Sequence, residues 1–251
     1  MKLPQIDGVS EIETFTVTAG ELRVTDPCYS MDTWCAGTLP NVMNGIWEAH
    51  VGYHKDSLDT EMGERWLQGE KKRIDEFAAT HAKNGLGNFV QHEYDRLEEK
   101  RKEFAARPGR VSYIHIIALG QETHFDNKTE LDSTWQLADI DVGVDSGQAG
   151  FFDVAEYAKA LEDRTDGTRA DQTNSKFEAF YESVCNLTLD DKSFGVVPFG
   201  CVSSSGYGDG GYNCYVRRND HGQAIEAIIV FIDEPEEELD DSEAGEDNSH
   251  D

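Results

Sequence analysis

Two glycines between a strand signal and a helix signal constrain the fold of this chain more than any other feature. Residues 134–144 alternate in polarity and predict a strand, and residues 143–153 continue the chain as GVDSGQAGFFD. Asp153, with a glutamate three residues later, has the capping-box spacing that begins a helix. Gly147 and Gly150 permit positive φ angles or a close backbone approach. We therefore predict a loop between a strand and a helix, which can hold a ligand or can form only a turn.

The chain is strongly acidic, and its charge bears on its partners. It has 251 residues, with 50 Asp and Glu against 22 Lys and Arg, and a formal net charge of -28. Nucleic-acid binding draws its affinity from Lys and Arg that neutralise phosphates, so this composition disfavours a nucleic-acid partner. Acidic excess also suits a halophilic host, because it keeps a protein dissolved in high salt, and the habitat stays open.

Hydropathy and cysteine usage indicate the compartment. No segment approaches the roughly 18 to 20 apolar residues that cross a bilayer, and the first residues lack the apolar core of a secretory signal. We expect a cytoplasmic protein without membrane contact. An odd number of cysteines without CxxC spacing favours reduced thiols over a disulfide scaffold or a zinc ribbon. They are Cys28, Cys35, Cys185, Cys201 and Cys214.

Alternating apolar residues predict an α+β fold with a largely antiparallel twisted sheet and helices on one side. Residues 11–17 and 21–24 predict a β-hairpin joined by an Ala-Gly turn. Residues 45–54 predict a half-buried strand that places His50 and His54 on its polar face. Two histidines about 13 Å apart along a strand are too distant to share a metal ion, so we interpret both as surface residues.

The second half of the chain supplies the other strands. Residues 111–119 are almost continuously apolar and predict a central strand covered on both faces. His115 lies within that strand, where a hydrogen-bonded core histidine is the favoured interpretation over a ligand. Residues 194–202 predict another strand, with residues 212–217 as its partner, and residues 223–232 predict a closing strand.

A charged helical hairpin is predicted as an insertion at about residues 64–107. Apolar residues recur there at spacings of three and four, and Asn-Gly-Leu-Gly-Asn at 84–88 separates two helices. The mixed charges favour a solvated helix surface, and a partner-binding surface stays open as an alternative. We expect the hairpin to pack on the sheet of a single domain spanning residues 1–232. Residues 233–251 hold eleven acids and no Lys or Arg, and predict a disordered acidic tail.

Three aspartates at predicted strand ends are candidates for a shared site. Asp26 lies in an Asp-Pro-Cys-Tyr turn, Asp145 in the glycine loop, and Asp209 in the Ser- and Gly-rich connection 203–211. Converging carboxylates can bind Mg²⁺, Mn²⁺ or Ca²⁺ or orient a polar ligand, although each aspartate is also explained as a turn residue. The candidate metal ligands are Asp26, Asp145 and Asp209. The candidate ligand-binding residues are Asp145, Ser146, Gly147, Gln148, Ser205, Gly206, Asp209 and Tyr212.

Two segments, residues 144–153 (VDSGQAGFFD) and 204–212 (SSGYGDGGY), resemble a family of functionally uncharacterised proteins of bacteria and their phages. The Asp-Pro-Cys-Tyr turn at 26–29 resembles the family more weakly, and the charged helical hairpin has no part in the resemblance. It implies that the two glycine loops belong together and, loosely, that the protein is phage-encoded. It brings no activity with it.

The sequence leaves two functions open. The chain contains no GxxxxGK[ST], HExxH or GxSxG motif, and no identifiable pair of nucleophile and base. The first hypothesis is a non-enzymatic binding or accessory protein whose glycine loops hold a small polar ligand or a partner's loop. The alternative is a divalent-metal-dependent hydrolase that acts on a phosphate-containing small molecule. The sequence assigns no catalytic residue, no ligand identity and no oligomeric state.

Overall fold

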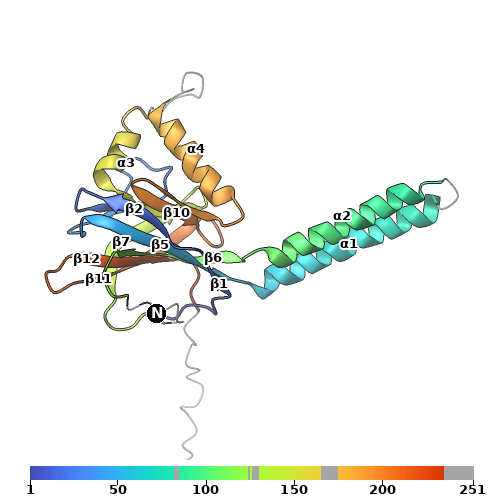
Figure 1. Ribbon diagram of the computed structural model, residues 1–251, viewed down its shortest axis with the longest axis horizontal. Helices are drawn as coiled ribbons and strands as arrows, with labels where there is room; N and C mark the ends of the chain where they lie inside the picture. Colours follow the sequence, from blue (N-terminus) through green and yellow to red (C-terminus); the bar gives the residue numbers. More distant parts are fainter. Residues whose placement is uncertain (82–84, 124, 126–129, 165–174, 235–251) are drawn as a thin grey trace, which may run out of the picture.

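Two antiparallel sheets packed face to face form the body of the protein (Figure 1). The structure is a computed structural model, and it describes residues 1–81, 85–123, 125, 130–164 and 175–234. The described residues form twelve strands and four helices. The α+β class and the antiparallel pairing are confirmed, but the strands divide into two sheets where the sequence predicted one. The predicted acidic tail falls, from residue 235 onward, outside the described residues.

The larger sheet has seven strands in the order β1-β5-β6-β12-β11-β7, and β2 lies beside β1 along β5. Its strands are β1 (Gly8–Val9), β2 (Glu13–Val17), β5 (Gly45–His54), β6 (Arg110–Ala118), β7 (Gln136–Val144), β11 (Gly210–Arg218) and β12 (Ala224–Val230). The β6 strand is central and buried, as predicted. The β11 and β12 strands pair as a hairpin across the turn at residues 219–222.

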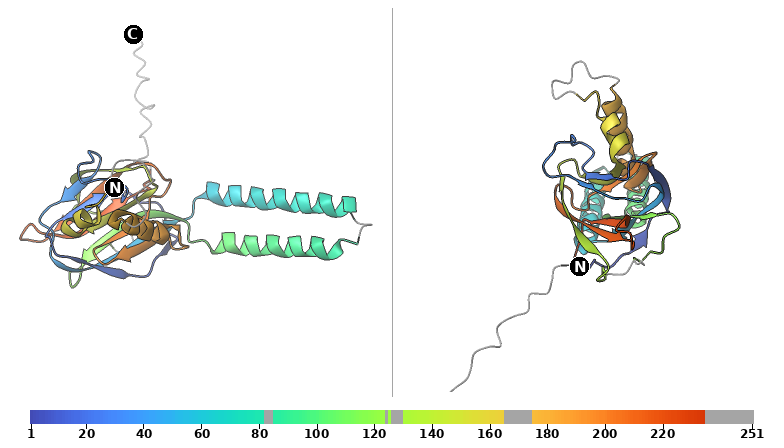
Figure 2. Two further views of the ribbon diagram at one scale, coloured as in Figure 1. Left: turned by 90° about the horizontal axis from the view of Figure 1, so that it is seen from above. Right: turned by 90° about the vertical axis from the view of Figure 1, so that its left-hand side faces the viewer.

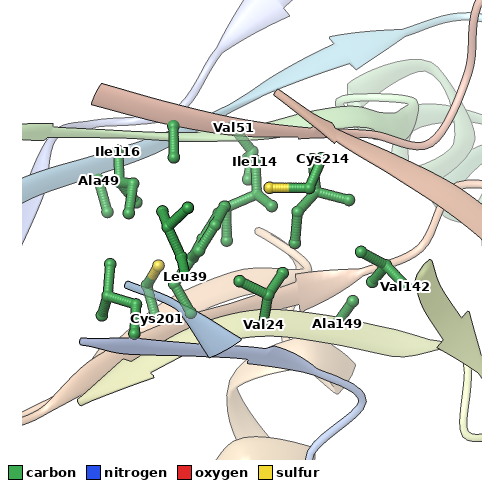
Figure 3. Close-up of a cluster of buried hydrophobic side chains, with 14 of the residues drawn as sticks. Val24, Leu39, Ala49, Val51, Ile114, Ile116, Val142, Ala149, Cys201 and Cys214 are labelled. Atoms are coloured by element: carbon green, nitrogen blue, oxygen red, sulfur yellow. The ribbon is translucent and has the colours of Figure 1, made fainter. Parts of the chain in front are cut away.

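The smaller sheet has five strands in the order β4-β3-β8-β10-β9. Its strands are β3 (Leu22–Thr25), β4 (Gly37–Leu39), β8 (Gln148–Asp153), β9 (Phe194–Val197) and β10 (Gly200–Ser204). The main apolar core lies between the two sheets (Figure 3). Val51 and Ile114 point into it from the larger sheet, and Val24 and Cys201 from the smaller one, each fully buried. Burial of this apolar surface is the main stabilising contribution to the fold.

Two helices cover the outer face of the smaller sheet, as predicted (Figure 1). They are α3 (Val154–Ala160) and α4 (Lys176–Leu189). The Asp153 carboxylate caps α3, and the Ser175 hydroxyl caps α4 by accepting a hydrogen bond from the Glu178 N–H. The cap at Asp153 was predicted from the glutamate three residues later, and Ser175 has the same spacing to Glu178. Phe152 of β8 packs against Phe180 of α4, with ring centroids 5.6 Å apart.

The charged helical hairpin projects away from both sheets (Figures 1 and 2). It consists of α1 (Ser57–His81) and α2 (Gly87–Ala106), so the first helix begins before the predicted boundary near residue 64. The prediction of two helices is confirmed, but the expectation that they pack on the sheet is wrong. The hairpin connects β5 and β6, which are neighbours in the larger sheet, and its helices run outward from the ends of these strands (Figure 2).

The predicted hairpin of residues 11–17 and 21–24 is also wrong. Both segments are strands, but β2 pairs with β5 in the larger sheet and β3 pairs with β4 and β8 in the smaller one. The connection between them is held by Asp153, whose Oδ2 accepts hydrogen bonds from the Thr18 and Ala19 N–H groups at 2.6 and 2.8 Å. A long-range carboxylate therefore overrides the local turn preference.

Two further expectations about pairing are corrected. Residues 148–153 form the buried strand β8 instead of a loop that leads directly into a helix. Residues 194–202 form two paired strands, β9 and β10, with Pro198 and Phe199 at the turn between them. The β11 strand pairs with β7 and β12 and has no pairing with β10. The apolar pattern identified strands within residues 194–202 and 212–217, but it identified neither the strand at residues 148–153 nor the sheet that each strand joins.

His50 is not the surface residue that the sequence predicted. Its ring lies 4.7 Å from the His115 ring, centroid to centroid, on the outer face of the larger sheet. His115 is a buried core residue, as predicted, and its Nε2 lies 2.8 Å from Glu226 Oε1. In the part of the chain that the structure describes, no helix has the length and apolar character needed to span a membrane.

Candidate functional site

A buried carboxylate organises the polar end of the two sheets. Asp26 follows β3 directly, and its side chain is fully buried. Its Oδ2 accepts hydrogen bonds from the N–H groups of Asp145 at 2.9 Å and Ser146 at 2.7 Å. Its Oδ1 accepts from the Cys28 N–H at 2.8 Å and the Ser146 hydroxyl at 2.7 Å. Asp26 therefore fastens the turn between β7 and β8 to the end of β3.

The second glycine loop lies against this turn. The Ser205 N–H donates to the Gly147 carbonyl at 3.0 Å, and the Ser205 hydroxyl donates to the Gly208 carbonyl at 2.8 Å. The Tyr212 hydroxyl reaches the carbonyls of both Ser205 and Gly208, at 2.9 and 2.6 Å. Gly147 and Gly208 have φ angles of 72° and 108°, which glycine adopts without strain. The structure thus places the two sequence-predicted loops side by side, with their polar groups bonded to each other.

Two more of the candidate ligand-binding residues also make internal contacts. Gln148 is buried, donates to Cys185 Sγ at 3.3 Å and accepts from the Thr188 hydroxyl at 2.9 Å. The Gly206 carbonyl accepts a hydrogen bond from Arg110 Nη1 at 3.1 Å. Gln148 therefore links β8 to α4, and Gly206 links its loop to the start of β6.

The candidate metal ligands are placed differently from one another. Asp26 is buried, whereas Asp145 and Asp209 are exposed. A carboxylate has about four lone-pair sites, and the four donors around Asp26 occupy them. Within the described ranges, no group of three or more His, Cys, Asp or Glu side chains is arranged to hold a metal ion. The geometry therefore offers no support for Mg²⁺, Mn²⁺ or Ca²⁺ at these three aspartates.

The loop between β3 and β4 presents an exposed aromatic side chain beside the turn between β7 and β8. We name residues 26–36 the Trp34 loop. Trp34 is 86% exposed, and Met31 on the same loop is 37% exposed. Within the loop, the Ser30 hydroxyl donates to Asp32 at 2.6 Å and the Thr33 N–H donates to the Ser30 carbonyl at 3.3 Å. The loop is therefore ordered by its own polar groups while its largest apolar side chain faces solvent.

Long-range hydrogen bonds fasten the Trp34 loop to the body. The Cys35 carbonyl accepts from the Gly143 N–H at 2.7 Å, and the Tyr29 carbonyl accepts from the Tyr157 hydroxyl at 2.7 Å. A Cβ added to Gly143 would lie 2.7 Å from Cys35 Sγ, so glycine is required for this close approach. Arg164 Nη1 donates to the Cys28 carbonyl at 2.5 Å. The loop is held on both sides of Trp34.

Burial shifts the pKa values of three titratable groups on and under the loop. Burial, together with Asp26, raises the pKa of the Cys28 thiol to about 12, so it stays protonated at neutral pH and is a poor nucleophile. Burial also raises the pKa of Tyr29, and its neighbours Cys35 and Asp145 add to the shift. Burial lowers the pKa of Arg23, whose guanidinium lies under the loop and donates to the Ser30 carbonyl at 3.4 Å.

Two packed antiparallel sheets, two covering helices and a polar rim of joined glycine loops define this chain as a two-sheet α+β protein. A family model described as "Protein of unknown function (DUF4241)" matches residues 140–229. The match confirms the resemblance to a family of unknown function over residues 140–229, a segment that includes both glycine loops. No curated protein and no solved structure matches the chain.

Sequence reasoning missed Trp34 and the contribution of α4 to the site. A tryptophan within the short polar stretch SMDTWCAG, between two predicted strands, was the available signal for an exposed aromatic residue. The contacts from Cys185 and Thr188 to Gln148 had no local signal, because α4 and β8 are brought together only by the packing of the helix on the smaller sheet.

Proposed function

We propose that this protein is a non-enzymatic binding protein that engages a loop of a protein partner at the Trp34 loop and the adjoining glycine turn. The observation that carries the proposal is the exposure of Trp34, 86%, on a loop that is fastened by hydrogen bonds on both sides. A tryptophan in solvent exposes on the order of 200 Å² of mainly apolar surface, which a partner can bury.

A fixed loop suits this role for an entropic reason. Association loses conformational freedom in the loops that become ordered, and a loop that is ordered beforehand avoids most of that loss. Tryptophan is also among the residues that contribute most to protein interfaces, particularly when polar groups surround it and exclude water. Met31 lies on the same loop as Trp34, and the exposed Asp145 lies in the turn that Asp26 fastens to the start of this loop.

The hydrogen-bonding pattern favours a protein partner over the small polar ligand of the first hypothesis. The backbone N–H groups of Asp145 and Ser146 donate to Asp26, and the Ser205 N–H donates to Gly147. A small polar ligand needs donors and acceptors that are not already paired within the protein. The exposed apolar side chain of Trp34 is instead suited to a partner surface of complementary shape.

The metal-dependent hydrolase has less support. Asp26 is surrounded by four hydrogen-bond donors, and the pKa of Cys28 is raised, so neither residue is prepared to bind a cation or attack a substrate.

The proposal includes a cytoplasmic location. The five cysteines of the described chain are free thiols, which a reducing compartment favours. If the protein is phage-encoded, as the loop resemblance suggests, that cytoplasm is the host's.

The test compares Trp34→Ala with Leu189→Ala. Leu189 is 83% exposed at the end of α4, so its truncation removes a similar kind of surface at a distant place. We expect cross-linking in cells that naturally express the chain, followed by mass spectrometry, to identify a partner that Trp34→Ala loses and Leu189→Ala retains. Both variants should unfold at the wild-type temperature, because surface truncations change stability by about 0.5 kcal/mol or less.

The proposal is overturned by a partner that does not need Trp34, or by a small ligand or metal ion that binds the candidate site. A partner that Trp34→Ala retains at wild-type level would exclude the Trp34 loop as the contact surface. A thermal-shift screen of nucleotides, sugars and divalent ions addresses the other hypotheses, since a ligand at 100 times its dissociation constant adds about 2.7 kcal/mol of stability. Saturable binding of Mg²⁺ or Mn²⁺ that is lost in Asp145→Asn and Asp209→Asn would support the hydrolase instead.

A further inference from the structure

The helical hairpin has too little core to account for its length. Its helices contain 25 and 20 residues. Among the hairpin side chains that the structure describes, Leu67 and Ile74 of α1 are buried and α2 has none buried. Most helical stability in proteins comes from packing of an apolar face against other elements. The hairpin stands away from its own sheets, so its stability would increase if another surface covered it.

Exposed apolar residues lie at the two ends of the hairpin. Met62 and Trp66 are one turn apart on α1 near the base, and Leu86 and Phe89 lie at the tip. These four side chains are 38 to 59% exposed. At the base, Met62, Trp66 and Phe104 help to line an open groove of about 970 Å³. The base of the hairpin therefore has a groove, and the tip of the hairpin has exposed apolar side chains that could occupy such a groove.

The hairpin differs in charge from the rest of the chain. Residues 57–106 contain nine Lys and Arg and eleven Asp and Glu, whereas the whole chain has a net charge of -28. Many of these charges are paired along the helices, as between Lys71 and Asp75 at 2.9 Å and between Lys100 and Glu103 at 2.6 Å. Two hairpins can therefore approach each other without the repulsion that two acidic bodies would meet.

We propose that the occupant of the groove is a second copy of this chain, whose hairpin lies antiparallel to the first. In this arrangement the groove at the base of each hairpin receives Leu86 and Phe89 from the tip of the other. The contact is self-complementary, as a two-fold interface must be. A parallel arrangement would instead bring the two acidic bodies together, within reach of their mutual repulsion.

The dimensions agree with such a four-helix bundle. At 1.5 Å per residue, α1 is about 37 Å long, and two neighbouring helices, each about 10 Å wide, present a face of roughly 700 Å². A stable interface buries about 800 Å² per partner. The hairpin face is therefore close to the size that a stable dimer needs. The bodies then lie at opposite ends of the bundle, separated by several Debye lengths of about 8 Å at physiological salt.

The oligomeric state of the full chain tests this proposal. We expect light scattering coupled to gel filtration to give a dimer at about 100 µM and dissociation on dilution. Met62→Glu together with Leu86→Glu should weaken association at least tenfold, because it buries carboxylates against apolar surface. The matched control is Leu137→Glu on β7, an exposed leucine outside the hairpin, which should remain a dimer. Circular dichroism should show that all variants keep their helices.

Cross-linking tests the antiparallel geometry. A chain with Met62→Cys is mixed with a chain with Leu86→Cys and treated with a short bismaleimide, and wild type measures the background from native thiols. Cross-links between positions 62 and 86 support the proposal, and cross-links between two copies of position 62 overturn the antiparallel arrangement. A wild-type monomer at about 100 µM, or a dimer that persists equally in the double glutamate variant, overturns the proposal as a whole.

Discussion

Asp26 accepts two hydrogen bonds from Ser146, one from its backbone N–H and one from its hydroxyl, both at 2.7 Å. The two residues are separated by 120 positions in the chain. Asp26 follows β3 of the smaller sheet, and Ser146 lies in the turn that leaves β7 of the larger sheet. This pair therefore joins the two sheets at the end that carries the Trp34 loop and the two glycine loops.

The first prediction concerns the substitution Asp26→Asn. An amide of the same size supplies one acceptor oxygen, and its NH₂ group faces donors where the carboxylate accepted them. Because the site is fully buried, we expect the free energy of unfolding to fall by about 3 kcal/mol, measured by urea denaturation. Asp209→Asn at an exposed position is the control and should change stability by less than about 0.5 kcal/mol. Equal changes in the two variants would refute the structural role of Asp26.

The second prediction is a pH dependence from Asp153. Burial acts to raise the pKa of this carboxyl, but hydrogen bonds from the Thr18, Ala19 and Glu156 N–H groups outweigh it, so the pKa is lowered on folding. A carboxylate with a lowered pKa stabilises the folded state above its unfolded pKa of about 3.9, and the stabilisation is lost as the pH falls through the folded value.

Asp153→Asn isolates this contribution from those of the other acids. We expect the difference in unfolding free energy between wild type and variant to be constant near neutral pH and to shrink as the pH falls below about 4. Urea denaturation between pH 7 and pH 3 measures it. A difference that stays constant down to pH 3 would show that Asp153 does not stabilise the fold as a carboxylate.

The third prediction compares two glycines by substitution to alanine. A Cβ added to Gly150 would lie 2.1 Å from the Cys201 carbonyl oxygen, an atom of the neighbouring strand backbone that cannot move without distorting β10. We expect Gly150→Ala to lower the free energy of unfolding by about 3 kcal/mol. Gly211→Ala should be nearly neutral, because a Cβ there meets no atom within 4 Å. Thermal unfolding of both variants provides the comparison.

The fourth prediction concerns a buried ion pair in the larger sheet. Glu226 Oε2 lies 2.5 Å from Arg217 Nε, and Glu226 is fully buried. Glu226→Gln leaves the guanidinium without its counter-charge, so we expect a loss of about 3 kcal/mol in unfolding free energy. Glu156→Gln removes the partner of Lys159 in an exposed pair and should cost less than about 0.5 kcal/mol.

A double-substitution cycle separates this ion pair from the packing around it. Arg217→Met combined with Glu226→Gln should destabilise the protein by less than the sum of the two single effects, because both substitutions remove the same interaction. Additive effects would indicate that Glu226 contributes mainly through His115 and Thr123, which contact its Oε1 atom.

Local features were predictable where the responsible residues are close in sequence. The helices of the hairpin, the caps at Asp153 and Ser175, and the alternating burial of β5 follow from spacings of a few residues. The two glycine loops were recognised as related, and the family match over residues 140–229 covers both of them. Helices, caps and alternating burial depend on backbone geometry and on which side chains can be buried. Short stretches of sequence determine both.

The division of the strands into two sheets was decided only by the tertiary structure. The apolar pattern of residues 11–24 is the same whether β2 and β3 pair with each other or join different sheets. Asp153 and Asp26 favour the second arrangement by accepting hydrogen bonds from backbone N–H groups more than a hundred positions away. Such bonds have no signature in the local sequence. The same Asp-containing sequence is compatible with a buried carboxylate and with an exposed turn residue, and the difference arises only when distant segments pack around the aspartate.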